Sequence, residues 1–116
     1  TVSFHLYENA EKAYFKQQDL SLEQLIQTAV AIARKDKKIV WCGELGMPGN
    51  DDKARQFFFR MMDAVGKSRI EISAIWSFKL QGTAQKEWDI SPTNERAYML
   101  DAVQKFNQRY ALGDWK

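Results

Sequence analysis

The amino-acid sequence predicts one α/β domain in which parallel strands alternate with helices. Three short segments, rich in β-branched and aromatic residues, are apolar enough to be buried strands. Three longer segments, each of which follows a strand, carry apolar residues at helical spacing. Strands joined in this way by amphipathic helices form parallel sheets through right-handed crossovers. The expected strands cover residues 2–7, 39–44 and 70–78, adjacent in that order, and the expected helices cover 21–36, 51–65 and 92–109.

Residues that favour helix ends set these boundaries. Ser21 and Gln24 have the spacing of a capping box at the start of the first helix. Gly66 is a natural end for the second helix, because glycine readily adopts the left-handed conformation that stops a helix. Ser91 followed by Pro92 predicts an N-cap and a proline in the first helical position of the third helix.

The segments between these elements are mostly polar. Residues 8–20 show poor periodicity, and residues 79–89 are expected to form a long loop that carries Trp88. Trp41 lies inside an apolar strand and is expected in the core. We see no linker, repeat or low-complexity tract, so residues 1–116 are expected to form a single unit.

Charge and composition exclude several classes of function. The 116 residues carry 17 basic and 15 acidic side chains, a net charge of +2 that gives no basic footprint for nucleic acid. The basic run at residues 34–38 coincides with an expected helix end, where cations are favoured by the helix dipole. No apolar run approaches the length of about 20 residues that a membrane span needs. The chain begins directly with strand-like residues and shows no signal peptide, as if cut from something longer.

Cys42 and His5 are the only residues of their kinds. A single cysteine forms no internal disulfide, and one histidine with one cysteine cannot build a thiolate or multi-histidine metal site. We therefore expect no metal and no cofactor.

Polar and aromatic residues gather where the three expected strands end. The first strand ends with His5 and Tyr7, the second with Glu44, and Trp76 lies near the end of the third. Since parallel strands place their carboxyl ends at one rim, where ligands bind, these side chains are expected to converge. A carboxylate there can attack or stabilise a cationic sugar centre, and an indole offers a flat face to a pyranose ring.

Each of these residues also has a plain structural explanation. Glu44 could form a surface ion pair at a strand end. His5 on an apolar strand would more often be a hydrogen-bonded core histidine, and Trp76 a core residue. The ordered combination of all four is what favours a site.

That combination resembles the last three strands of the cellulase-type (β/α)8-barrel glycoside hydrolases, family five and its clan A relatives. The similar motifs are His-x-Tyr in residues 5–7, Glu-x-Gly in residues 44–46 and Ile-Trp-x-Phe in residues 75–78. The resemblance implies the C-terminal portion of a TIM barrel and an oligo- or polysaccharide substrate. It implies that Glu44 is the catalytic nucleophile, and that His5, Tyr7 and Trp76 bind substrate. Secreted and periplasmic locations are both compatible with it, and the compartment stays open.

One part of the family pattern is missing. A retaining glycosidase needs a second carboxyl group as acid/base, which in this clan follows an asparagine at the end of the fourth strand. Asn94 and Glu95 form such a pair, but they are expected in the first turn of the last helix, where an acidic side chain complements the dipole. By itself the chain is therefore expected to be inactive.

Two other functions stay open: a non-catalytic carbohydrate-binding or scaffold role, and a small α/β interaction module. In any of these, three parallel strands leave exposed edges. We expect the isolated chain to self-associate or to pair with the missing part of a barrel.

Overall fold

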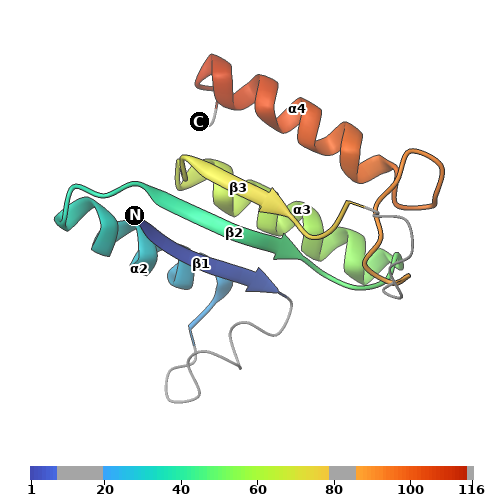
Figure 1. Cartoon of the computed structure of the whole chain (residues 1–116), viewed down its shortest axis with the longest axis horizontal. Helices are drawn as coiled ribbons and strands as arrows, with labels where there is room; N and C mark the ends of the chain where they lie inside the picture. Colours follow the sequence, from blue (N-terminus) through green and yellow to red (C-terminus); the bar gives the residue numbers. More distant parts are fainter. Residues whose placement is uncertain (8–19, 79–85, 115–116) are drawn as a thin grey trace.

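The computed structural model describes residues 1–7, 20–78 and 86–114, and it confirms the alternation of strands and helices. The elements are β1 (Val2–Tyr7), α2 (Leu22–Lys35), β2 (Val40–Gly46), α3 (Asp52–Lys67), β3 (Ile72–Ile75) and α4 (Tyr98–Leu112). Within these ranges the strands form a parallel sheet in the order β1-β2-β3, as expected (Figure 1). Because the strands run the same way, their carboxyl ends lie at one rim of the sheet.

The core lies between the sheet and its helices. Helices α2 and α3 lie behind the sheet in Figure 1. Helix α4 packs against α3, where the Phe58 and Tyr98 rings meet edge to face at 6.1 Å. All three helices and the strands β1 and β2 contribute fully buried side chains, among them Leu6, Ile26, Leu45, Phe58 and Met99.

The predicted start of α2 is confirmed, and the predicted end of α3 at residue 65 is two residues early. The Ser21 side chain accepts a hydrogen bond from the Gln24 N–H at 3.3 Å, and the Gln24 side chain accepts one from the Ser21 N–H at 2.8 Å. Helix α3 continues through Gly66 to Lys67, with Ser68 as its C-cap.

The third strand is shorter than the predicted range 70–78, since β3 covers only Ile72–Ile75. The Trp76 N–H still donates to the Leu45 carbonyl of β2 at 2.9 Å, but from Ser77 on the backbone bonds to a later segment. The Ser77 N–H donates to the Trp88 carbonyl at 3.3 Å, and the Ile90 N–H donates to the Ser77 carbonyl at 2.9 Å. These two hydrogen bonds bring Trp88 to the carboxyl end of the sheet.

The predicted start of the last helix is wrong, because α4 begins at Tyr98 and not at Pro92. The Asn94 side chain holds residues 91–96, which precede α4, in turns. Its Oδ1 accepts hydrogen bonds from the N–H groups of Ser91 at 3.2 Å and Arg96 at 3.1 Å. A side chain that bonds to nearby backbone groups competes with helix formation.

The face of the sheet opposite the helices is open in the described part of the chain. Trp41 lies there with 44% of its surface exposed, next to the half-exposed Ile72 of β3. The prediction that Trp41 belongs to the core is wrong, because its neighbours Val40 and Cys42 take the helix side of the strand. None of the helices in the described ranges is long and apolar enough to cross a membrane.

Candidate active site

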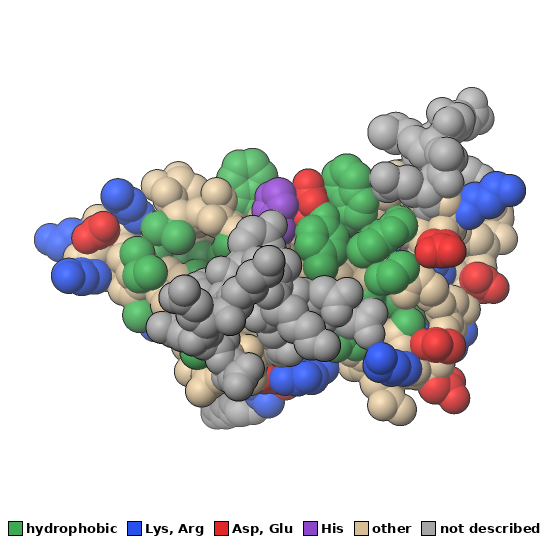
Figure 2. All heavy atoms as spheres, turned by 90° about the horizontal axis from the view of Figure 1, so that it is seen from below, with side chains coloured by type: hydrophobic (Ala, Val, Ile, Leu, Met, Phe, Trp, Pro, Cys, Tyr) green, Lys and Arg blue, Asp and Glu red, His purple; other side chains and the backbone are tan. Residues whose placement is uncertain are grey.

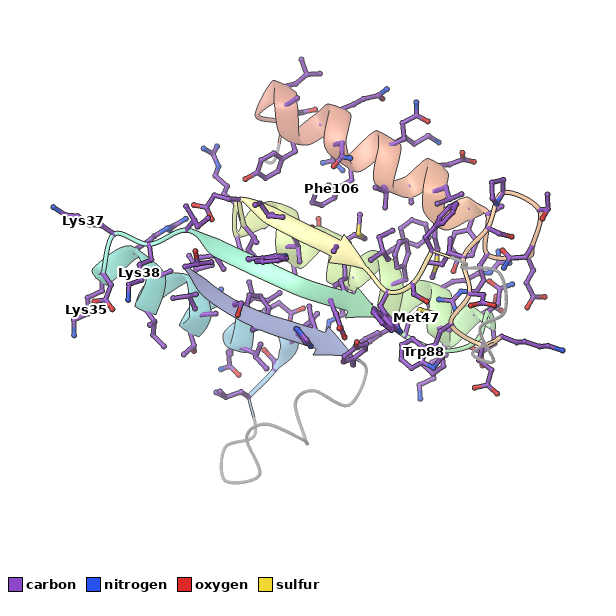
Figure 3. The ribbon with its side chains drawn as sticks, viewed as in Figure 1. Lys35, Lys37, Lys38, Met47, Trp88 and Phe106 are labelled. Carbon is purple, nitrogen blue, oxygen red and sulfur yellow. The ribbon has the colours of Figure 1, made fainter. Side chains whose placement is uncertain are left out.

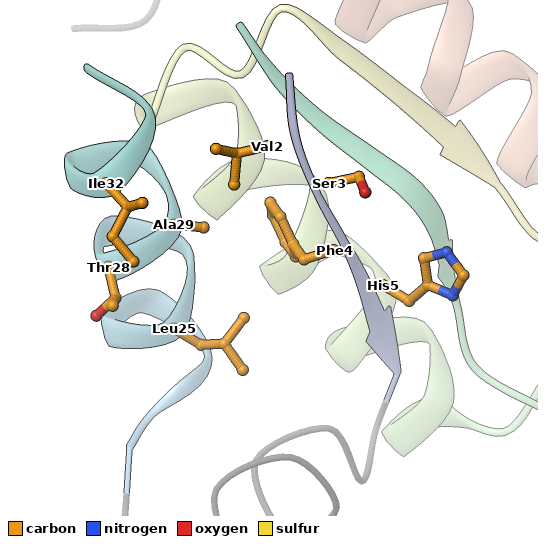
Figure 4. Close-up of a pocket in the computed structure, with 8 residues that line it drawn as sticks. All are labelled: Val2, Ser3, Phe4, His5, Leu25, Thr28, Ala29 and Ile32. Atoms are coloured by element: carbon orange, nitrogen blue, oxygen red, sulfur yellow. The ribbon is translucent and has the colours of Figure 1, made fainter. Parts of the chain in front are cut away.

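Strand β1 sends alternate side chains to the two faces of the sheet. Val2 and Phe4 point toward α2, whereas Ser3 and His5 point the other way (Figure 4). Since side chains alternate along a strand, Tyr7 shares the face of His5, at the carboxyl end. The open face of β1 therefore ends in an imidazole and a phenol.

Strand β2 contains one residue more than its neighbours at the position that matters for Glu44. His5 pairs with Glu44 although the preceding pair uses Cys42, so Gly43 has no partner in β1. The register with β3 shifts in the same place. An extra residue inverts the alternation beyond it. Without this bulge Glu44 would share the core side with Cys42; with it, Leu45 is buried and Glu44 lies beside His5.

Two side chains of β1 hold the Glu44 carboxylate. The Tyr7 hydroxyl donates a hydrogen bond to Glu44 Oε2, and His5 Nδ1 lies 3.4 Å from the same oxygen. The Glu44 side chain is 28% exposed and that of His5 is 43% exposed, so the carboxylate is oriented by protein groups yet open to a ligand. Figure 2 shows the histidine beside an acidic side chain, with hydrophobic side chains on both sides.

Gly46 lets the end of β3 lie directly against β2. A Cβ atom at Gly46 would lie 2.8 Å from the Trp76 carbonyl oxygen and 3.4 Å from Trp88 Cζ3. The glycine of the Glu-x-Gly motif is thus required by the close approach of another backbone. Trp76, whose peptide bond to Ser77 is cis, is 37% exposed beside it. Among the described residues, the polar contacts of the Glu44 carboxylate are to Tyr7 and His5.

Trp88 is a residue of this rim that the sequence analysis did not assign to the site. Its ring meets the Tyr7 ring edge to face, with the centroids 5.5 Å apart. Figure 3 shows it with Met47 at the carboxyl end of the sheet. The signal available in the sequence was a tryptophan inside a polar loop, since such a large aromatic side chain usually has a packing or binding partner.

Other reactive groups near the rim do not fit a site. Burial raises the pKa of the Cys42 thiol to about 12, so this thiol stays protonated and is a poor nucleophile. In the described ranges no three histidine, cysteine or acidic side chains gather as metal ligands. Asn94 precedes α4 instead of starting it, and its amide donates to the Asp89 carbonyl at 2.8 Å. Glu95 beside it is exposed, so this Asn-Glu pair belongs to the turns before α4 and not to the rim.

The fold matches solved structures of glycoside hydrolases. The chain superimposes on the X-ray structure of the endo-β-1,4-mannanase from Thermotoga petrophila with a TM-score of 0.63 at 16% identity, over 96% of this chain and 26% of that one. A structure of the hyperthermostable endo-1,4-β-D-mannanase of strain RKU-1 with maltose and glycerol gives a TM-score of 0.59 at 18% identity, over 89% of this chain and 32% of that one. No protein-family model and no curated protein sequence matches the chain.

These comparisons establish the fold. The described chain is α/β, with the architecture of part of a (β/α)8 barrel. It spans about a quarter to a third of the length of the mannanases it matches. In such barrels the active site lies at the carboxyl rim of the strands, which is the rim occupied here by Glu44.

Proposed function

We propose that residues 1–116 are the nucleophile-bearing part of a retaining glycoside hydrolase that acts on β-linked glycans. The observation that carries the proposal is the Glu44 carboxylate, which lies at the carboxyl rim in contact with Tyr7 and His5. A bulge in β2 turns this side chain away from the core, and a buried acid would otherwise cost several kcal/mol. The mannanase-like fold supports the same class of reaction.

The proposed chemistry has two displacements. Glu44 Oε1 or Oε2 attacks the anomeric carbon, the bond to the leaving oxygen breaks, and that oxygen takes a proton from an acid/base group. Water then attacks the same carbon, gives a proton to that group, and displaces the Glu44 carboxylate. Tyr7 and His5 orient the carboxylate, and the exposed faces of Trp76 and Trp88 offer stacking surfaces to the sugar rings.

The acid/base group would come from outside the described contacts of Glu44. Tyr7 and His5 are its polar neighbours, and neither supplies the second carboxyl that a retaining mechanism needs. Another segment of the barrel would therefore complete the site. The mannanase activity of the matched proteins makes β-1,4-linked glycans the first substrates to test.

Covalent labelling tests the nucleophile directly. The complete gene product that carries residues 1–116 is incubated with dinitrophenyl 2-deoxy-2-fluoro-β-glycosides of gluco and manno configuration. The activated leaving group departs without protonation, and the fluorine slows hydrolysis of the intermediate, so an ester should accumulate on Glu44. Peptide mass spectrometry should find the sugar on Glu44 alone. A label on another carboxylate, or none, would contradict the proposal.

The open surfaces of the sheet lead to a proposal about partners. Strands β1 and β3 are the outer strands of the described sheet, and an apolar groove of about 420 Å³ lies between β1 and α2 (Figure 4). Val2 and Phe4 line it from the strand, and Leu25 and Ile32 from the helix. We propose that a further β/α segment of the barrel covers this groove.

The isolated 116-residue chain should therefore self-associate, because an open apolar strand edge favours pairing. Sedimentation velocity at increasing concentration should show a rising mass. Replacing Phe4 with Ser should reduce the association, whereas Gln27→Ser on the exposed side of α2 should not. A stable monomer at all concentrations would argue against the proposal.

A non-catalytic sugar-binding role is the second candidate. It is favoured by the absence of a carboxyl group from the polar contacts of Glu44 in the described ranges. The two candidates differ in the labelling test, since a binding module would bind β-linked oligosaccharides without forming an ester on Glu44.

A further inference from the structure

Arg96 is a buried cation that joins two loops beneath the rim. Only 2% of its surface is exposed. One terminal guanidinium nitrogen, Nη2, donates to the Met47 carbonyl at 2.9 Å, and the second, Nη1, donates to the Glu87 carbonyl. The first nitrogen also lies 3.5 Å from Met99 Sδ. A buried charge of this kind is costly unless its hydrogen bonds are made, so its position calls for an explanation.

The two carbonyls belong to segments that border the candidate site. Met47 follows the last residue of β2, three positions after Glu44, and Glu87 directly precedes Trp88. The Gly49 N–H donates to the same Glu87 carbonyl at 3.0 Å, so Arg96 reinforces a junction that the backbone already makes. The planar guanidinium can bind two carbonyls at once in a fixed geometry, which an ammonium group cannot do.

The junction leads to the nucleophile through a short series of contacts. Arg96 fixes the Glu87 carbonyl and hence the start of Trp88. The Trp88 ring packs edge to face on Tyr7, and the Tyr7 hydroxyl donates to Glu44. Displacement of the Trp88 backbone would free the Tyr7 ring to rotate and release the carboxylate.

We propose that Arg96 is a positioning residue, which holds Trp88 against Tyr7 and thereby orients the Glu44 carboxylate for attack. The proposal rests on the function proposed above. Arg96 itself touches neither substrate nor the reacting atoms. A purely structural role would place its effect in stability alone, so the test needs a readout at Trp88 and a readout at Glu44.

The test compares Arg96→Lys with Arg55→Lys in the complete gene product. Arg55 is a matched control, since its side chain donates to the Asn50 carbonyl of the same β2–α3 loop at 3.2 Å and lies over the Tyr98 ring. It has no described contact with Glu87. Fluorotryptophan incorporation, with Trp88→Phe to identify the resonance, reports the environment of Trp88. The rate of fluoroglycoside labelling reports the alignment of Glu44.

Arg96→Lys should shift the Trp88 resonance and slow labelling on the order of 10- to 100-fold, because a misplacement of about 1 Å costs that much. Arg55→Lys should leave both unchanged. Trp88→Ala should slow labelling in the same way, and the double variant with Arg96→Lys should be no slower than Trp88→Ala, since the two act in series. If Arg96→Lys is partly unfolded, each labelling rate is divided by the folded fraction from urea unfolding, and the corrected double variant must still be no slower than Trp88→Ala.

Failure of the proposed function and failure of the Arg96 proposal give different results. A wild-type protein that is never labelled at Glu44 overturns the proposed function, and the positioning role with it. A labelled wild type with an equally fast Arg96→Lys variant overturns only the role of Arg96. A shifted Trp88 resonance with unchanged labelling does the same, and shows that Trp88 does not orient the carboxylate.

Discussion

Glu44→Gln should reduce the turnover of a β-1,4-glycan by at least about 10⁴-fold in the complete gene product that carries residues 1–116. Losses of this order follow when a catalytic nucleophile is removed from an enzyme. The amide keeps the shape of the side chain and can accept a hydrogen bond from Tyr7, but it cannot form the glycosyl ester. The dissociation constant for an oligosaccharide should change little, because the stacking surfaces remain. Release of reducing ends measures turnover, and calorimetric titration measures binding.

Glu95→Gln is the matched control for this substitution. Glu95 is an exposed glutamate in the turns before α4, and its Asn-Glu sequence has the form of the family's acid/base pair. Its loss should leave turnover unchanged, since its neighbour Asn94 is occupied in turn hydrogen bonds. Wild-type turnover in Glu44→Gln would remove Glu44 from the mechanism. A large loss in Glu95→Gln would reassign the acid/base role.

The order and type of the elements could be predicted because local and long-range signals agree. The apolar period changes between strand and helix segments at capping residues such as Ser21, and a parallel sheet is the simple way to bury such strands. The last helix was placed too early because Ser91-Pro92 is a helix-start pattern that Asn94 overrides. Its side chain bonds to nearby backbone groups, which a pattern of single residues does not reveal.

The arrangement of the candidate site could be predicted only in outline. Strand ends alone place His5, Tyr7 and Glu44 at one rim, but strict alternation along β2 would have turned Glu44 toward the helices. The bulge at Gly43 decides which face the carboxylate takes, and a bulge depends on pairing with both neighbouring strands. Trp88 was not foreseen because its position depends on hydrogen bonds between two segments that follow β3.

Gly46→Ala should destabilise the rim more than any other single-methyl addition there. The new Cβ would lie 2.8 Å from the Trp76 carbonyl oxygen, which is backbone and cannot rotate away. The backbone of β2 or of the β3 end must shift, and such overpacking typically costs about 1–3 kcal/mol. The displaced segment carries Trp76 and contacts Trp88, so binding of β-linked oligosaccharides should weaken as well. Urea unfolding measures the free energy of unfolding, and calorimetric titration measures the loss of affinity.

Gly43→Ala provides the comparison, because it adds the same methyl group three residues earlier in the same strand. There the new Cβ would lie 3.1 Å from His5 Nε2, an atom of an exposed side chain that can rotate. Its effect on the free energy of unfolding should stay within about 0.5 kcal/mol, as for other substitutions whose neighbours can yield. Equal destabilisation by the two substitutions would mean that the contact with the Trp76 carbonyl does not set the geometry of the rim. The glycine of the Glu-x-Gly motif would then need another explanation than the close approach of β3.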